Sequence, residues 1–133
     1  MTTEPDHEVP DHEARIRVAV VDDDASVREA LRVMLTTDDR FELVGVTDGG
    51  WKALELVGDW DAEIIVLDQV MPGGDGMTIL SRLSRWAPNS KVVLFTGRPE
   101  TARGAYDGGV AEVLTKPMEP SKFLDRLVAV ARG

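Results

Sequence analysis

The sequence predicts an α/β domain in which a parallel β-sheet carries helices on both faces. Five short apolar segments, mostly rich in β-branched residues, alternate with segments whose apolar residues recur every three or four positions. The first pattern indicates buried parallel strands, and the second indicates amphipathic helices. Polar residues directly follow several of the strand segments, where the loops of such a sheet begin. Right-handed crossovers between successive strands then place helices on both faces.

Length and composition favour one soluble domain. The chain has 133 residues, 43% of them hydrophobic, which is enough for one core. The absence of cysteine excludes disulfides and thiolate chemistry. No apolar run approaches the ~20 residues that cross a bilayer, and the polar N-terminus is unlike a secretory signal. We therefore expect a cytoplasmic protein that does not bind membranes.

The charge of the chain is strongly negative. Formal net charge is −9, from 24 acidic and 15 basic residues. Such a surface repels phosphate backbones, so we expect no direct nucleic-acid binding by this chain. It is compatible with the binding of a cation.

Residues 1–14 differ from the rest of the chain. The unit Pro-Asp-His-Glu occurs there twice, at 5–8 and 10–13, and includes both histidines, His7 and His12. A metal-binding arm is one interpretation. The composition favours a disordered acidic tail that is dispensable for folding, because it offers almost no apolar surface to bury. Its five acidic residues are Glu4, Asp6, Glu8, Asp11 and Glu13.

The regular pattern begins at residue 15 and divides into strands and helices. The expected strands cover residues 16–21, 41–46, 64–67, 91–96 and 111–114. Asp24 is a plausible N-cap of the first helix, and Pro120 suits the first turn of the last. The expected buried faces of the four clearest helices consist of Val27, Ala30, Leu31, Met34 and Leu35; Trp51, Leu54 and Val57; Met77, Leu80, Leu83 and Ala87; and Phe123, Leu124, Leu127, Val128 and Ala131.

A further helix, between the fourth and fifth strands, has the weakest pattern. Pro99, Gly104, Gly108 and Gly109 interrupt this segment. Because glycine costs about 1 kcal/mol in a helix interior, we expect a short or frayed helix there.

Chemically active side chains follow four of the expected strands. Asp22 and Asp23 follow the first strand, Asp68 follows the third, Thr96 ends the fourth, and Lys116 lies just after the fifth. Because parallel strands end at the same edge of a sheet, these groups are expected to converge. Closely spaced carboxylates repel each other, and a hard divalent cation with oxygen ligands relieves this repulsion. The pattern therefore predicts a Mg²⁺ site at this edge.

These residues resemble, in order, the motif of response regulator receiver domains. The resemblance covers residues 15–132, and it includes the turn Met71-Pro72-x-x-Asp75-Gly76 and the dipeptide Lys116-Pro117. It implies a flavodoxin-like, doubly wound (βα)5 fold with strand order 2-1-3-4-5, in a domain at 15–133 that follows the tail. Any one of these residues alone has an ordinary structural explanation, such as a helix-capping acid or a turn threonine.

The resemblance also implies roles for the site residues. Asp68 would accept a phosphoryl group from a histidine kinase or a phosphotransfer protein. Asp23 would bind Mg²⁺ directly, Asp22 would bind it through water, and Asp68 and the backbone carbonyl of Val70 would be the other ligands. Lys116 would pair with a phosphoryl oxygen.

The remaining implied roles concern switching. The Thr96 hydroxyl would turn inward to the phosphoryl group, and Pro117 would follow a cis peptide bond. The chain would not be an enzyme beyond supporting its own phosphorylation and slow dephosphorylation. Phosphorylation would switch a protein-interaction surface, whose downstream partner the sequence does not identify, and a phosphorylation-dependent homodimer is one outcome.

The sequence departs from the family pattern near the fifth strand. Val113 occupies the position of the usual aromatic switch residue, and Thr96 and Lys116 are only 20 positions apart. Tyr106 could substitute for the aromatic, although an ordinary exposed tyrosine is the simpler interpretation.

Three other functions fit parts of the pattern. One is a receiver-like interaction module that works without phosphorylation. Another is the receiver fragment of a LuxR-type transcription factor, suggested by Phe41-Glu42-Leu43-Val44-Gly45-Val46. The third is a haloacid-dehalogenase-like phosphohydrolase, which is disfavoured because Val70 occupies the place of its second aspartate.

Overall fold

The computed structural model describes residues 15–68, 76–102, 104 and 109–133. The expected acidic tail at 1–14, the expected ligand Val70 and the alternative switch residue Tyr106 lie outside these residues. In the described ranges, no helix is long and apolar enough to cross a membrane.

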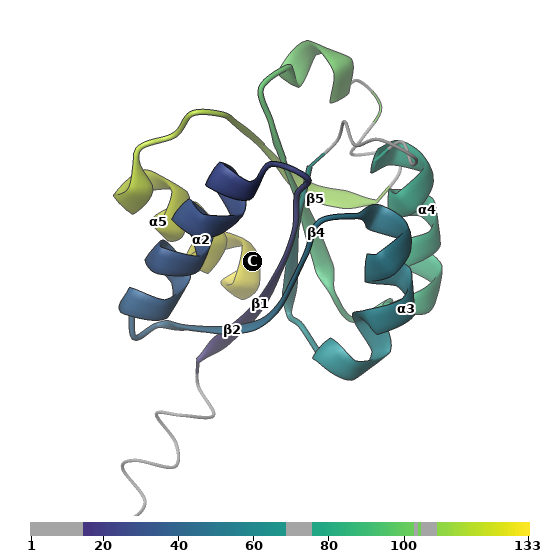
Figure 1. The fold of residues 1–133 in the computed structure, drawn as a ribbon, viewed down its shortest axis with the longest axis horizontal. Helices are drawn as coiled ribbons and strands as arrows, with labels where there is room; N and C mark the ends of the chain where they lie inside the picture. Colours follow the sequence, from purple (N-terminus) through teal and green to yellow (C-terminus); the bar gives the residue numbers. More distant parts are fainter. Residues whose placement is uncertain (1–14, 69–75, 103, 105–108) are drawn as a thin grey trace, which may run out of the picture.

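The fold is a five-stranded parallel sheet (Figure 1). The strands are β1 (Ile16–Val21), β2 (Phe41–Thr47), β3 (Ile64–Leu67), β4 (Lys91–Thr96) and β5 (Val110–Thr115). Their order is β2-β1-β3-β4-β5, which confirms the expected flavodoxin-like topology. β2 and β5 are each longer than the sequence pattern indicates, because pairing with β1 and β4 extends their ends.

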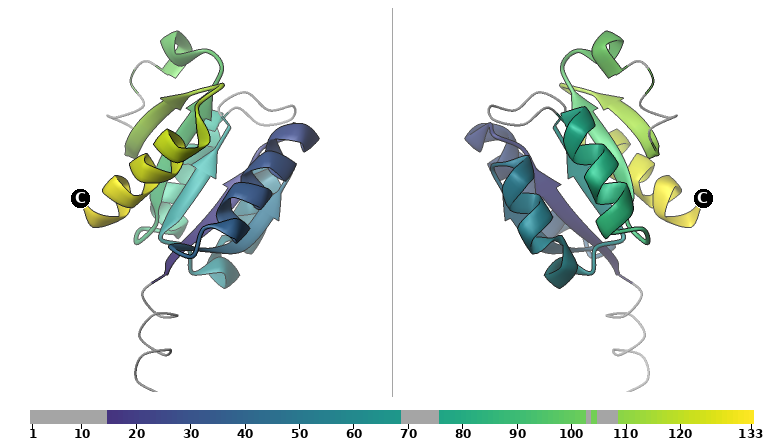
Figure 2. Two further views of the ribbon diagram at one scale, coloured as in Figure 1. Left: turned by 90° about the vertical axis from the view of Figure 1, so that its left-hand side faces the viewer. Right: turned by 90° about the vertical axis from the view of Figure 1, so that its right-hand side faces the viewer.

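Two helices cover each face of the sheet (Figures 1 and 2). α2 (Ala25–Thr37) and α5 (Pro120–Arg132) lie on one face, and α3 (Gly50–Trp60) and α4 (Gly76–Trp86) lie on the other. Each strand therefore buries alternate side chains in two separate apolar clusters. The central strand β3 is buried along its whole length.

The α2/α5 side of the core packs around aromatic rings. The ring centroids of Phe95 and Phe123 are 4.9 Å apart, and Phe123 is fully buried. On the α3/α4 side, the indole of Trp60 covers the backbone of Gly45, where a Cβ atom would lie 2.1 Å from Nε1. Trp60 can therefore pack in this position only because residue 45 of β2 is a glycine.

The helix starts confirm the two expected signals. The side chain of Asp24 accepts hydrogen bonds from the amides of Ser26 and Val27 at the start of α2. Pro120 occupies the first turn of α5, and the Glu119 side chain accepts from the amide of Lys122.

Of the described side chains expected to be buried, two are exposed; the side chain of Met77 lies outside the described ones. Ala30 lies on the outer surface of α2, where Leu31 and Leu35 are the fully buried residues. Trp51 is 44% exposed, whereas Ala53 in the same turn of α3 is buried. The sequence pattern thus included one exposed residue in each of α2 and α3, and it missed the buried residues Ala53, Ile79 and Val130.

The segment between β4 and β5 contains a single turn of 3₁₀-helix, η1 (Pro99–Ala102), within its described residues. This agrees with the short helix expected from its proline and glycines. Gly104 and Gly109 both have positive φ angles, which favour glycine.

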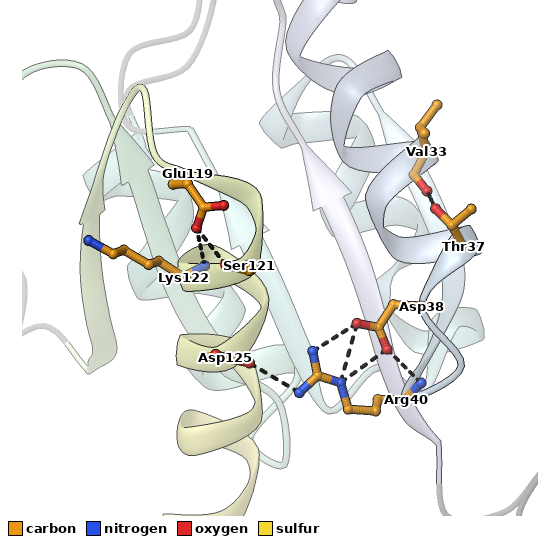
Figure 3. A network of polar contacts seen from close by, with 8 residues as sticks. All are labelled: Val33, Thr37, Asp38, Arg40, Glu119, Ser121, Lys122 and Asp125. Carbon is orange, nitrogen blue, oxygen red and sulfur yellow. Dashed lines mark hydrogen bonds and ion pairs between the residues drawn. The ribbon is translucent and has the colours of Figure 1, made fainter.

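An arginine joins the end of α2 to α5 (Figure 3). Arg40 donates to both carboxylate oxygens of Asp38, and its other nitrogen lies 3.1 Å from Asp125. Residues 85 positions apart in the chain are thereby connected at the edge of the sheet opposite the strands' carboxyl ends.

Candidate functional site

Strand register brings two aspartates side by side. Val21 of β1 pairs with Leu67 of β3, so that the next residues, Asp22 and Asp68, are neighbours at the carboxyl edge of the sheet. The Asp68 amide donates to the Val21 carbonyl at 2.9 Å, which continues the ladder past the end of β3. The backbone position of Asp68 is therefore fixed by the pairing of the buried strands β1 and β3.

Three carboxylates converge at this edge. Asp22, Asp23 and Asp68 each offer an oxygen, and the three atoms lie within 4.8 Å of one another. Asp22 and Asp68 are buried, whereas Asp23 is exposed. The cluster thus has a buried base and an open side.

Lys116 approaches the cluster from the other end of the chain. Its Nζ lies 2.8 Å from Asp22 Oδ2 and 3.5 Å from Asp68 Oδ1. The ammonium also lies 5.6 Å from the centroid of the Phe95 ring. The ammonium is partly shielded from water, which strengthens its attraction to both carboxylates.

The carboxylate of Asp22 is held on both sides. Oδ1 accepts from the Asp24 amide at 2.9 Å, while Oδ2 binds Lys116. The guanidinium of Arg28 donates to the Asp22 backbone carbonyl at 2.9 Å. Sequence reasoning missed Arg28, although its place on the first turn of α2, close to the aspartates, was a usable signal.

Thr96 lies beside these charged groups. It is buried, and its hydroxyl accepts a hydrogen bond from the Arg98 amide at 3.0 Å. Its carbonyl accepts from the Lys116 amide at 2.8 Å, which positions the start of the β5–α5 loop. The peptide bond between Lys116 and Pro117 is cis, as the resemblance implies.

Val113 lies on the other side of the sheet. It is partly buried and packs against the apolar cluster beneath α3 and α4, whereas Lys116 lies over Phe95 of the α2/α5 cluster. Thr96 follows Phe95 in β4, so the alternation of side chains along a strand puts Thr96 on the same side of the sheet as Val113.

The donor set fits a hard divalent cation. All three acidic groups present oxygen atoms, which are the ligands that Mg²⁺ prefers, and Asp23 leaves the cluster accessible from solvent. The mutual repulsion of three carboxylates provides a physical reason for a cation to bind there.

Comparison with known proteins agrees with this arrangement. The family description "Response regulator receiver domain" matches residues 18–128. A protein-glutamate methylesterase/protein-glutamine glutaminase of Myxococcus xanthus is 39% identical over 105 residues, which are 77% of this chain and 30% of that protein. A second such protein, from Cereibacter sphaeroides, is 37% identical over 108 residues, covering 79% of this chain and 30% of the relative. The chain thus spans about 30% of the length of these curated relatives.

Solved structures show the same fold. The signal receiver domain of a response regulator, NarL, from Mycobacterium tuberculosis is 27% identical, with a TM-score of 0.82 and coverage of 90% of this chain and 98% of that one. The response regulator domain of Thermotoga maritima CheB has the same TM-score and coverages at 23% identity. On the family match and the fold together, this chain belongs to the response regulator receiver domain family.

Proposed function

We propose that the domain at residues 15–133 accepts a phosphoryl group on Asp68 from a histidine kinase or a phosphotransfer protein, in a Mg²⁺-dependent reaction. The observation that carries this proposal is the cluster of Asp22, Asp23 and Asp68 with Lys116 in contact with two of them. A buried carboxylate beside an ammonium and a cation-binding cluster is suited to receive a group that carries negative charge.

In this proposal, an oxygen of Asp68 attacks the phosphorus of a phosphohistidine. The new O–P bond forms as the P–N bond breaks, and the imidazole leaves with the bonding electrons. Catalysis of such a transfer is mainly positioning and charge neutralisation. The ladder bond to Val21 holds the Asp68 backbone, so the carboxylate needs little reorganisation.

Mg²⁺, held by Asp23, by Asp22 and by the Val70 carbonyl, would supply positive charge to the transferred oxygens. Lys116 exchanges its contact with Asp68 for a phosphoryl oxygen and keeps its contact with Asp22. The Thr96 hydroxyl gives up the hydrogen bond from the Arg98 amide, and donates to the phosphoryl group. The domain contributes no catalysis beyond its own phosphorylation and dephosphorylation.

An apolar groove beside the site supports docking of a phosphodonor domain. It has a volume of about 240 Å³ and lies between α2 and the β5–α5 loop. Lys116 and Phe95 are among its lining residues, so a protein seated there would lie next to the ammonium that contacts Asp68. The other lining residues are Ser26, Val27, Ala30, Leu31, Met34, Pro117 and Met118.

Incubation with acetyl phosphate and Mg²⁺, followed by intact mass measurement, tests this function. We expect one phosphoryl group on the natural chain and none on Asp68→Asn. Asp24→Asn is the matched control, because Asn is also a good N-cap and Asp24 does not contact Lys116. Modification that survives Asp68→Asn would show that another residue is the acceptor.

A further inference from the structure

The surface formed by α3 and α4 carries an unusual group of side chains. Trp51 is 44% exposed and Trp86 is 55% exposed, whereas Trp60, the third tryptophan of the chain, is buried. The guanidinium carbon of Arg82 lies 5.2 Å from the centroid of the Trp51 ring. Arg85 and Trp86 follow at the third and fourth positions after Arg82, and thus lie next to it on α4. We call Trp51, Arg82, Arg85 and Trp86 the tryptophan–arginine face.

The two arginines of this face have no carboxylate partner among the residues that the structure describes. Within the described part of the chain, Arg82 and Arg85 form no ion pair. Arginines elsewhere, such as Arg17, Arg32 and Arg40, each contact carboxylates. The sequence from residue 76 to residue 99 contains no Asp or Glu at all, in a chain whose net charge is −9.

Exposed tryptophan beside unpaired arginine is the side-chain chemistry that protein-binding surfaces use most. The face is too small for nucleic acid, since two arginines cannot offset the repulsion between the remaining acidic surface and a phosphate backbone. The binding partner that fits the tryptophan–arginine face is therefore a short acidic protein segment with apolar groups between its carboxylates.

The chain itself contains such a segment. Residues 1–14 hold five acids and no lysine or arginine, and each of the two Pro-Asp-His-Glu units sets a proline ring beside carboxylates. Proline rings pack well on tryptophan, and carboxylates pair with arginine. The prolines and carboxylates of this segment are thus complementary to the tryptophans and arginines of the tryptophan–arginine face.

The segment also has the length to reach this face. β1 and β4 begin at the same edge of the sheet, and only β3 separates them, so their starts are about 10 Å apart. Trp86 lies five residues before Lys91, the first residue of β4, and thus near that edge. Fourteen residues span up to about 46–50 Å. Figure 2 shows α3 and α4 side by side above the start of β1.

We propose that the tryptophan–arginine face is a docking site for acidic protein segments and that its occupant in this chain is the N-terminal segment 1–14. Connection through the chain gives the segment a high effective concentration at the face, so weak individual contacts suffice. The contact is electrostatic and exposed, and it is therefore weakened by salt without changing the fold. It does not depend on phosphorylation of Asp68.

Because the chain contains no cysteine, a single introduced cysteine can carry a spin label at a defined position. Thr3→Cys, carrying a nitroxide, should broaden the amide signals of residues 81–86 in ¹⁵N NMR spectra and leave those of α2 around Val33 unaffected. Arg82→Gln with Arg85→Gln should abolish the broadening. Lys122→Gln with Arg132→Gln removes the same charge from exposed positions on α5 and should leave the broadening intact.

Three results would overturn the proposal. The first is equal broadening on α2 and α4, and the second is broadening that survives the Arg82/Arg85 double variant. The third concerns a mixture of ¹⁵N-labelled natural chain with unlabelled chain that carries the nitroxide. Full broadening of the ¹⁵N signals in that mixture would mean that the segment of a second copy occupies the face.

The indole signals provide an independent readout. Deleting residues 1–14, or adding about 1 M NaCl to the full chain, should shift the Nε1–H signals of Trp51 and Trp86. The signal of Trp60, buried against Gly45, serves as the internal reference and should not move. If all three indole signals are unchanged by the deletion, the segment does not occupy the face.

Discussion

At the scale of single residues, the site is a balance between like charges and one lysine. Asp22 and Asp68 are buried and share the ammonium of Lys116, whereas Asp23 projects into solvent at the open side of the cluster. In the proposed function, the same groups bind a cation and then a phosphoryl group. Without the cation, the carboxylate of Asp23 repels those of Asp22 and Asp68, and this repulsion destabilises the folded state.

We expect Asp23→Asn to raise stability in the absence of Mg²⁺ and to remove the stabilisation by Mg²⁺. Ligand linkage predicts about 2.7 kcal/mol for the natural chain at a hundredfold excess over the dissociation constant. Urea unfolding with and without MgCl₂ measures both effects, and Asp24→Asn should retain the Mg²⁺ response. Identical unfolding curves for the natural chain with and without Mg²⁺ would rule out the metal site.

At the scale of elements, close packing of β2 against α3 depends on one glycine. A Cβ at Gly45 would overlap the Trp60 indole at 2.1 Å, whereas a Cβ at Gly58 of α3 would meet nothing within 4 Å. The two glycines therefore have opposite roles, although both lie in regular structure.

Gly45→Ala should destabilise the domain by about 1–3 kcal/mol, because Trp60 must leave its packed position. Gly58→Ala is the matched control and should stabilise it by roughly 0.5–1 kcal/mol through helix propensity. Chemical denaturation compares the two variants directly. Equal effects of the two substitutions would show that Trp60 moves aside without cost.

The pairing of Arg40 with Asp38 in the α2–β2 turn makes stability depend on pH (Figure 3). Hydrogen bonds from Arg40 lower the pKa of Asp38 below its ordinary value of 3.8. A lowered folded-state pKa contributes stability that is present above pH 3.8 and is lost as pH falls through the lower, folded value.

Arg40→Met should therefore destabilise the chain at pH 7 by at most about 1 kcal/mol, since Arg40 is exposed and Asp38 is only partly buried. The difference between variant and natural chain should shrink in acid below pH 3.8. Thermal unfolding at a series of pH values measures this difference, and Arg132→Met is a control on α5 outside the contact. A difference that stays constant down to pH 2 would contradict the assignment.

At the scale of the whole molecule, the site is connected to the segment between β4 and β5, whose described residues contain one 3₁₀ turn. Thr96 ends β4, and the single turn η1 follows it within three residues. Because Val113 has no ring to bury, a switch that moves an aromatic side chain at this position is not available. The response to phosphorylation is then expected in the glycine-rich segment itself, where local opening costs little free energy.

Beryllofluoride with Mg²⁺ should therefore change hydrogen exchange most between residues 97 and 110, and Val113→Tyr should not be required for the change. A charge-assisted hydrogen bond from Thr96, worth about 1.5–3 kcal/mol, is enough to shift such a local equilibrium. Hydrogen-exchange mass spectrometry with and without beryllofluoride tests this. The hypothesis fails if exchange in 97–110 is unaltered, or if it changes only in Val113→Tyr.

The sequence by itself determined the succession of strands and helices, the N-cap Asp24 and the strand ends that carry Asp22, Asp68 and Lys116. It did so because burial periodicity and capping are local properties, readable within one element. The exact buried residues were less well predicted: Ala30 and Trp51 are exposed, whereas Ile79 and Val130 are buried without having been expected.

The sequence also predicted that these residues converge at one edge of the sheet, but only the tertiary structure decided which atoms are in contact. Lys116 binds Asp22, 94 positions away, because the sheet order puts β1, β3, β4 and β5 in register at one edge. The packing of the helices on the sheet also brings the Trp60 indole against Gly45 and the Arg82 guanidinium over the Trp51 ring at the surface. Contacts between distant elements depend on where whole faces come together in space, and no local pattern contains that information.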